Sequence, residues 1–319
     1  MDLRKRVDFP NSRPGCLEIG LVNNMPDAAL EATERQFRAL LAAAAGDLTV
    51  RLTFYALPEV PRSEVGLAHI RSYNTVDDLW NRPIDGLIVT GAEPRAPSLR
   101  DEPYWGSLTR LLDWAERETY SSIWSCLAAH AAVCHLDGID RLPYSDKRFG
   151  VFESAQVADH PLLAAAPRRL RMPHSRWNDI PEDAVAEAGY RVLTRSTEAG
   201  VDTLVKERKS LFVLFQSHPE YGAETLLLEY RRDLRRFLRG ERETYPIMPQ
   251  GYFTPDAVRA LTALQARALA DRREDLLQEF PASAYHVTNT WRRTGTAIYR
   301  GWLEYVCAQK ERRRRAELG

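Results

Sequence analysis

The chain has 319 residues, of which 44% are hydrophobic and 28% are charged, a composition that supports a globular fold with a full core. Its 44 basic residues balance 44 acidic residues, which argues against binding to nucleic acid or to an anionic membrane surface and favours small-molecule chemistry. The charged N-terminus lacks the apolar core of a signal peptide, and the most apolar span, 39–45, is too short to cross a membrane. Four cysteines without regular spacing favour a reducing cytoplasm, no disulfide framework and no metal site.

Strand-like and helix-like segments alternate along the first half of the chain, after a polar N-terminal arm at residues 1–15. Apolar runs predict strands at 17–22, 48–55, 85–90 and 120–124, and helices at 27–45, at 105–118 and directly after Cys126. Because these strands are apolar throughout, the pattern predicts a doubly wound α/β fold with a mostly parallel sheet covered by helices on both faces. We expect residues 16–319 to form a single domain.

The second half of the chain follows a different pattern. Shorter β-like runs, which we interpret as antiparallel additions to the sheet, occur at 151–157, 190–194, 203–205 and 211–215. The remainder predicts C-terminal helices at about 224–238, 256–277 and 285–311.

Cys126 occupies a strand-to-helix turn, between the run 120–124 and an alanine-rich segment. Such a turn holds the sulfur above the edge of the sheet, and the following helix directs free N–H groups and a partial positive charge toward it, which favours the thiolate. His218 and Glu220 follow the run 211–215 in the same way. A cysteine, a histidine and a glutamate can act as nucleophile, general base and orienting carboxylate.

The expected sheet brings these residues together. Ligand sites in parallel sheets lie at the carboxyl ends of the strands, where Gly91, Cys126 and His218 are all predicted to lie. A lone cysteine is more often a small core residue, which is our interpretation of the other three cysteines, and His-Pro-Glu alone could be a turn. The combination of the two signals favours a catalytic site.

An ordered set of motifs runs from about residue 16 to about residue 306. The motifs are Asn23-Asn24-Met25-Pro26, Gly86-Leu87-Ile88-Val89-Thr90-Gly91-Ala92, Tyr104-Trp105, Cys126, Gly150-Val151-Phe152-Glu153, Pro173-His174-Ser175-Arg176, His218-Pro219-Glu220-Tyr221, Tyr252-Phe253 and Trp291-Arg292. Together they resemble the homoserine O-succinyltransferase family of methionine biosynthesis, which has the class I glutamine amidotransferase fold.

The resemblance implies that an acyl group passes from acyl-coenzyme A, a co-substrate, to the hydroxyl of homoserine through a thioester on Cys126. His218 would be the general base and Glu220 the orienting carboxylate, and no bound cofactor is implied. Arg176 and Arg232 match arginines that hold the amino-acid substrate, although both could instead form structural ion pairs. A homodimer is expected by resemblance alone.

The backbone N–H groups at Leu127 and near Gly91 are expected to hold the oxyanion of the reaction.

The chain departs from the family pattern at several positions. Leu127 stands where the family commonly has tryptophan, His130 stands where it has glutamine, and the usual lysine pair is absent after Met25-Pro26. The position that discriminates acyl groups aligns with Arg95, whose guanidinium could pair with the distal carboxylate of a succinyl group. Succinyl is therefore favoured over acetyl, unless Arg95 turns outward to solvent.

Three other functions fit parts of the pattern. A glutamine amidotransferase or amidase would use the same three catalytic residue types, but its cysteine is normally flanked by glycines where this chain has Trp124 and Ala128. An acyltransferase acting on a different hydroxy amino acid is a second alternative. A non-catalytic binding protein is a third, and the intact set of Cys126, His218 and Glu220 argues against it.

Overall fold

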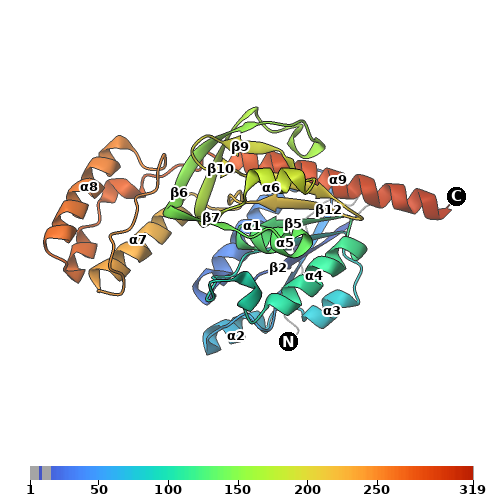
Figure 1. The fold of residues 1–319 in the computed structure, drawn as a ribbon, viewed down its shortest axis with the longest axis horizontal. Helices are drawn as coiled ribbons and strands as arrows, with labels where there is room; N and C mark the ends of the chain where they lie inside the picture. Colours follow the sequence, from blue (N-terminus) through green and yellow to red (C-terminus); the bar gives the residue numbers. More distant parts are fainter. Residues whose placement is uncertain (1–6, 9–15, 319) are drawn as a thin grey trace.

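The computed structural model describes residues 7–8 and 16–318, and its centre is a sheet of eight strands in the order β1-β3-β2-β4-β5-β12-β11-β8 (Figure 1). Five neighbouring strands run parallel: β3 (Val50–Tyr55), β2 (Leu17–Val22), β4 (Gly86–Val89), β5 (Ser121–Ser125) and β12 (Leu211–Phe215). Antiparallel strands complete both edges: β1 (Val7–Asp8), β11 (Thr203–Glu207) and β8 (Arg191–Val192). Except for β1, the arm expected at residues 1–15 lies outside the described residues.

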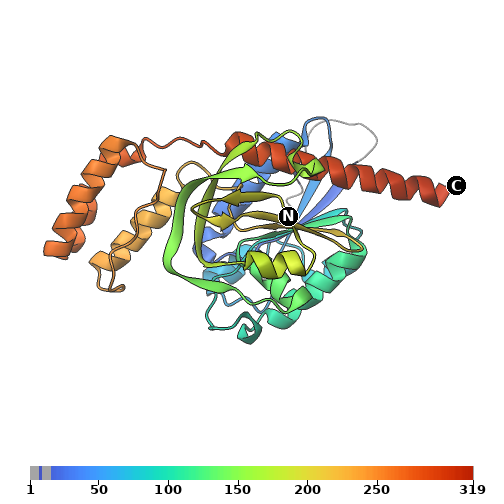
Figure 2. The ribbon, with the colours of Figure 1, turned by 45° about the horizontal axis from the view of Figure 1, so that its top comes forward.

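Helices cover both faces of the sheet, as the apolar strands require. One face packs against α1 (Leu30–Ala45), which follows the 3-10 turn η1 (Asp27–Ala29), against η3 (Pro161–Leu163) and against the long α9 (Arg292–Leu318). The other face carries α3 (Val76–Trp80), α4 (Trp105–Glu118), α5 (Leu127–Asp137) and α6 (Glu182–Glu187). Figure 2 shows the sheet between these two layers, with the end of α9 projecting past it. The predicted doubly wound α/β fold is confirmed.

A second, four-stranded antiparallel sheet has the order β10 (Gly200–Val201), β9 (Thr194–Ser196), β6 (Leu142–Gln156) and β7 (Arg169–Asp179). The prediction was incomplete here, because β6 starts nine residues before the run expected at 151 and β7 was missed. It was also wrong for 211–215, since β12 pairs in parallel with β5 and is a core strand of the main sheet. Only its other neighbour, β11, is antiparallel to it.

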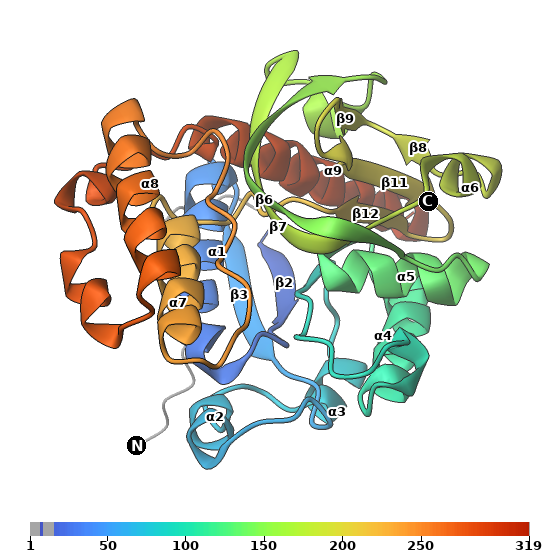
Figure 3. The same ribbon diagram turned by 60° about the vertical axis from the view of Figure 1, so that its left-hand side comes forward.

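The C-terminal helices form a separate layer beside the sheets, which comes forward in Figure 3. It contains α7 (Thr225–Leu238), α8 (Pro255–Ala270), η4 (Glu274–Glu279) and η5 (Ala282–Tyr285), which share an apolar cluster with part of β6. Helix α9 begins at Arg292, seven residues later than the start predicted from the sequence, residue 285. Two short helical segments, α2 (Glu64–Ile70) and η2 (Leu99–Asp101), lie in connections of the first half. Across the described residues, no helix combines the length and apolarity needed to cross a membrane.

Candidate active site

Cys126 lies at a strained turn between β5 and α5, and it caps the N-terminus of α5. Its backbone has φ 52° and ψ −115°, and it is the one non-glycine residue with positive φ in the described part of the chain. L-residues with side chains rarely adopt this conformation, and such strain clusters at functional sites. The Cys126 N–H donates to the carbonyl of Phe215 (2.7 Å), so that the neighbouring strand β12 holds the turn. The thiol is half-buried.

His218 and Glu220 emerge just beyond the end of β12. The His218 N–H donates to the Pro173 carbonyl (2.8 Å), and ring atom Nδ1 lies 2.8 Å from Glu220 Oε1. Because Glu220 engages Nδ1, Nε2 is the ring nitrogen left to face Cys126. Both side chains are buried. This is the order required of a nucleophile, a base and an orienting carboxylate.

The electrostatics of this group favour a protonated His218. Burial by itself lowers the pKa of an imidazole, but the negative charge of Glu220 and the interaction with Cys126 outweigh burial and raise the pKa of His218 well above its ordinary value. The Tyr221 ring stacks on the imidazole, with ring centroids 4.2 Å apart and planes inclined by 17°. The stacking and the bond to Glu220 together fix the orientation of the ring.

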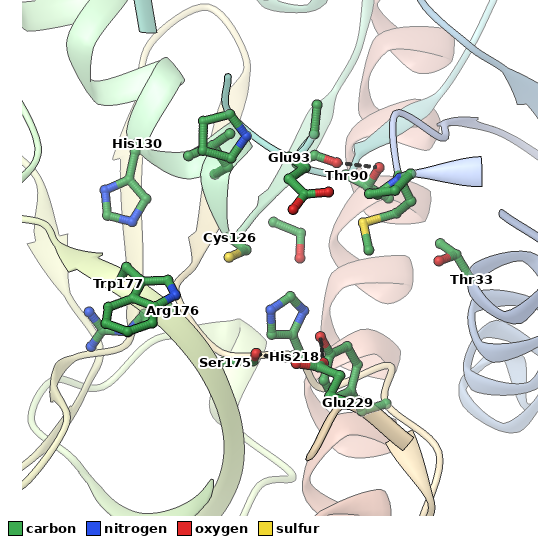
Figure 4. A pocket seen from close by; sticks show the side chains of 18 of the residues that line it. Thr33, Thr90, Glu93, Cys126, His130, Ser175, Arg176, Trp177, His218 and Glu229 are labelled. Carbon is green, nitrogen blue, oxygen red and sulfur yellow. Dashed lines mark hydrogen bonds between the residues drawn. The ribbon is translucent and has the colours of Figure 1, made fainter. Parts of the chain in front are cut away.

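These residues line a pocket with a volume of about 270 Å³ (Figure 4). Gly91, two residues after the end of β4, and Leu127, the first residue of α5, lie in its wall. A Cβ atom on Gly91 would come within 2.8 Å of Leu127 Cβ and 3.0 Å of Leu127 N, so only glycine allows the two segments to approach this closely. The N–H groups of a first helical turn have no acceptor within the helix, so the Leu127 N–H finds none in α5 and is available to a ligand in the pocket.

A charged cluster lines the part of the pocket next to His218. Glu229 accepts hydrogen bonds from Ser175 Oγ (2.6 Å) and Tyr221 OH (2.8 Å), and the Lys147 ammonium lies 3.3 Å from it. Burial raises the pKa of a carboxyl group, but the charge of Lys147 and the bonds from Ser175 and Tyr221 outweigh it and hold the pKa of Glu229 below its ordinary value. Glu229 is therefore a carboxylate at neutral pH.

Arg232, one helical turn after Glu229, also lines the pocket, and its side chain is 53% exposed. It donates through Nε to Asp233 (3.0 Å). Burial lowers the pKa of a guanidinium, but the carboxylates of Asp233, Glu229 and Glu93 outweigh burial and raise the pKa of Arg232. The same pocket thus offers a carboxylate and a guanidinium on one face of α7, with Lys147 beside them.

Arg176 differs sharply from Arg232, although both arginines line the pocket. It is 3% exposed, and its guanidinium donates to protein groups on several sides. The acceptors are His174 Nδ1 (3.3 Å), the Asn178 carbonyl (2.6 Å), Asp179 Oδ1 (3.0 Å), Tyr144 OH (3.4 Å) and the Ala199 carbonyl. These contacts match the structural ion pair that the sequence left open for this residue.

Arg95 lies outside the lining of the pocket. It is exposed and is not among the residues that line the pocket, although its neighbours Glu93 and Pro94 are. The carboxylate of Glu102 accepts hydrogen bonds from the N–H groups of Arg95 (2.6 Å) and Ala96 (2.7 Å), which fixes this loop. The geometry matches the alternative in which Arg95 turns to solvent.

Sequence reasoning missed several polar residues of the pocket, namely Lys147, Ser175, Trp177, Tyr221 and Glu229. Ser175 and Tyr221 stood inside recognised motifs, but nothing in a single sequence indicated that Lys147 on β6 would meet Glu229 on α7. Among the residues described by the structure, no group of three or more His, Cys, Asp or Glu side chains could hold a metal ion.

Comparisons with known proteins identify the fold and the family of the chain. A glutamine amidotransferase from Methylobacillus flagellatus has a similar fold, with a TM-score of 0.51 and 15% identity over 91% of this chain and 95% of that one. A homoserine O-succinyltransferase of Rhodopseudomonas palustris is 50% identical over 90% of this chain and 87% of its own length. One from Methylorubrum extorquens is 46% identical over 94% and 90%. The family Homoserine O-succinyltransferase matches residues 10–313. The chain therefore belongs to the homoserine O-succinyltransferase family, a family of acyltransferase enzymes.

Proposed function

We propose that this protein transfers a succinyl group from succinyl-coenzyme A to the hydroxyl of homoserine through a thioester on Cys126, in methionine biosynthesis. The observation that carries the proposal is the pocket itself. It places the strained Cys126 and the His218–Glu220 pair beside a carboxylate and a guanidinium that fit the two charged ends of an amino acid.

The first half-reaction loads the enzyme. The Cys126 thiolate attacks the thioester carbonyl of the donor, and the oxyanion is held by the Leu127 N–H and by backbone near Gly91. The carbon–sulfur bond to coenzyme A then breaks, and His218 supplies the proton that the departing thiolate takes up. The products are the acyl-enzyme and free coenzyme A.

The second half-reaction uses the same groups in reverse. His218 takes the proton from the acceptor hydroxyl, the oxygen attacks the acyl-enzyme carbonyl, and the Cys126 thiolate leaves. Glu229 pairs with the ammonium of the acceptor, and Arg232 holds its carboxylate through the free side of the guanidinium. Because one site serves both half-reactions in turn, we expect ping-pong kinetics.

A donor-by-acceptor panel tests this function. Acetyl- and succinyl-coenzyme A are each combined with homoserine, serine and related hydroxy amino acids, and release of free coenzyme A is measured. Intact mass after incubation with donor alone should show one acyl group on wild type and none on Cys126→Ala. Release of ammonia from glutamine without any acyl adduct would contradict the proposal and favour an amidotransferase.

We also propose that the enzyme works in the cytoplasm as a homodimer. A reducing compartment suits a cysteine nucleophile, which must stay unpaired to react. Sedimentation velocity of the full-length chain distinguishes a dimer from a monomer.

A further inference from the structure

His130 is a buried polar side chain that the catalytic group does not use. It lies on the first turn of α5, is 3% exposed, and lines the same pocket as Cys126. Its Nδ1 atom is buried and has no hydrogen-bond partner among the described residues. An unpaired polar atom in a protein interior destabilises the fold, so a group placed beside the nucleophile in this state points to a ligand.

The position of His130 relative to Cys126 suits the acyl chain. Cys126 occupies the N-cap of α5, His130 follows four residues later on the first turn, and both residues line the pocket. In a succinyl group bound to the sulfur, three carbon–carbon bonds of about 1.5 Å each separate the thioester carbon from the distal carboxyl carbon, so the free carboxylate extends away from the sulfur into the pocket. Figure 4 shows His130 and His218 on different sides of Cys126, which leaves the acceptor side of the pocket free.

The charges around His130 favour an anion. Burial, followed by the positive charges of Arg176 and Arg141, lowers the pKa of His130 to about 3, so the ring is neutral at physiological pH. A neutral imidazole carries one N–H donor. The Nη1 atom of Arg141 is likewise buried without a partner among the described residues. By contrast, the negative charges of the pocket carboxylates Glu93 and Glu229 raise the pKa of Arg232.

We propose that His130 determines donor specificity by donating a hydrogen bond to the distal carboxylate of the succinyl group. The inference rests on the proposed acyl transfer. It assigns recognition of the distal carboxylate to His130, which lines the pocket, instead of to Arg95. Acetyl has no distal carboxylate, so it leaves the imidazole unpaired. The distal carboxylate of succinyl accepts the hydrogen bond from the imidazole, which gives the two donors different affinities for the same site.

The test compares kcat/KM for succinyl- and acetyl-coenzyme A in wild type, His130→Leu and His130→Gln. We expect wild type to prefer succinyl, and His130→Leu to reduce the succinyl-to-acetyl ratio by roughly tenfold to a hundredfold, the usual effect of losing one hydrogen bond to a charged group. His130→Gln keeps an N–H donor and should retain part of the preference. His135→Leu is the matched control, because His135 is on the same helix but outside the pocket lining and pairs with Asp113.

A thermal melt accompanies the kinetics. His130→Leu removes a buried unpaired polar atom, so its melting temperature should equal or exceed that of wild type, which excludes misfolding as the cause of altered selectivity. An acyl adduct on Cys126 with an unchanged ratio in His130→Leu would overturn the role of His130 alone. A wild type that prefers acetyl would overturn that role and the choice of succinyl as the transferred group, but not the thioester mechanism. Failure of both donors to acylate Cys126 would overturn the proposed function as well.

Discussion

Replacing Arg176 and Arg232 by lysine should give different results, although the family resemblance implies the same substrate-holding role for both. The buried Arg176 guanidinium donates to groups on several sides, including the carbonyls of Asn178 and Ala199. A lysine ammonium donates from one nitrogen and cannot reach these acceptors together. At least two charge-assisted hydrogen bonds are lost, each worth about 1.5 kcal/mol or more, so Arg176→Lys should lower the free energy of unfolding by about 3 kcal/mol.

Arg232→Lys is the matched comparison. Its side chain is half-exposed and makes one ion pair, with Asp233, so the same substitution should change the free energy of unfolding by less than about 1 kcal/mol. Instead it should raise the KM for homoserine about tenfold, because a point charge replaces a two-pronged contact with the substrate carboxylate. Urea titration and steady-state kinetics on both variants measure the two effects. Wild-type stability with a raised acceptor KM in Arg176→Lys would refute the structural role argued for Arg176.

Four further outcomes are expected. Cys126→Ala should fold normally but release no coenzyme A from either donor, as a spectrophotometric thiol assay will show. His218→Asn should lower kcat about a hundredfold or more, and Glu220→Gln should do less harm; a larger loss in Glu220→Gln would mean that the carboxylate takes a direct part in the chemistry. Because the folded-state pKa of His218 is raised, the stability that its protonation contributes is present below about pH 6.5 and is lost as pH rises through that pKa. The urea concentration at the midpoint of unfolding should therefore fall over that pH range in wild type but not in His218→Asn. Gly91→Ala should lower kcat at least tenfold with little change in circular dichroism, because its Cβ would displace Leu127, whose N–H is the proposed oxyanion donor.

The first half of the fold followed from the sequence because its strands are buried on both faces and its helices alternate with them. The boundaries of β2 and α4 agree with the predicted ones to the residue. Strand β7 was missed because Pro173 falls within it and because polar residues, His174 and Arg176, take the buried positions that continue the alternation of Leu170 and Met172. The structure shows why proline is tolerated there: β7 is an edge strand of the second sheet, so no ladder partner is lost on its open side.

The catalytic residues could be proposed because each directly follows an apolar strand, and parallel strands end at one edge. Strand periodicity carries no such information about the charged groups of the pocket. Lys147 and Glu229 are 82 residues apart, on β6 and α7, and meet only because the second sheet packs beside the C-terminal helices. Likewise, Arg176 and Arg232 differ in burial, which depends on contacts with segments such as 199–201 that are distant in the chain.

The backbone of Cys126 bears on how the site would evolve. With φ at 52°, this position would be occupied at lower free energy by glycine, and conformations of this kind cost on the order of 1–3 kcal/mol for a residue with a side chain. In a copy of the protein released from selection for catalysis, Cys126→Gly would be a stabilising change within reach of a single nucleotide substitution. Keeping cysteine here opposes folding stability, so its presence records selection for chemistry more directly than any apolar residue of the core, whose retention also serves stability.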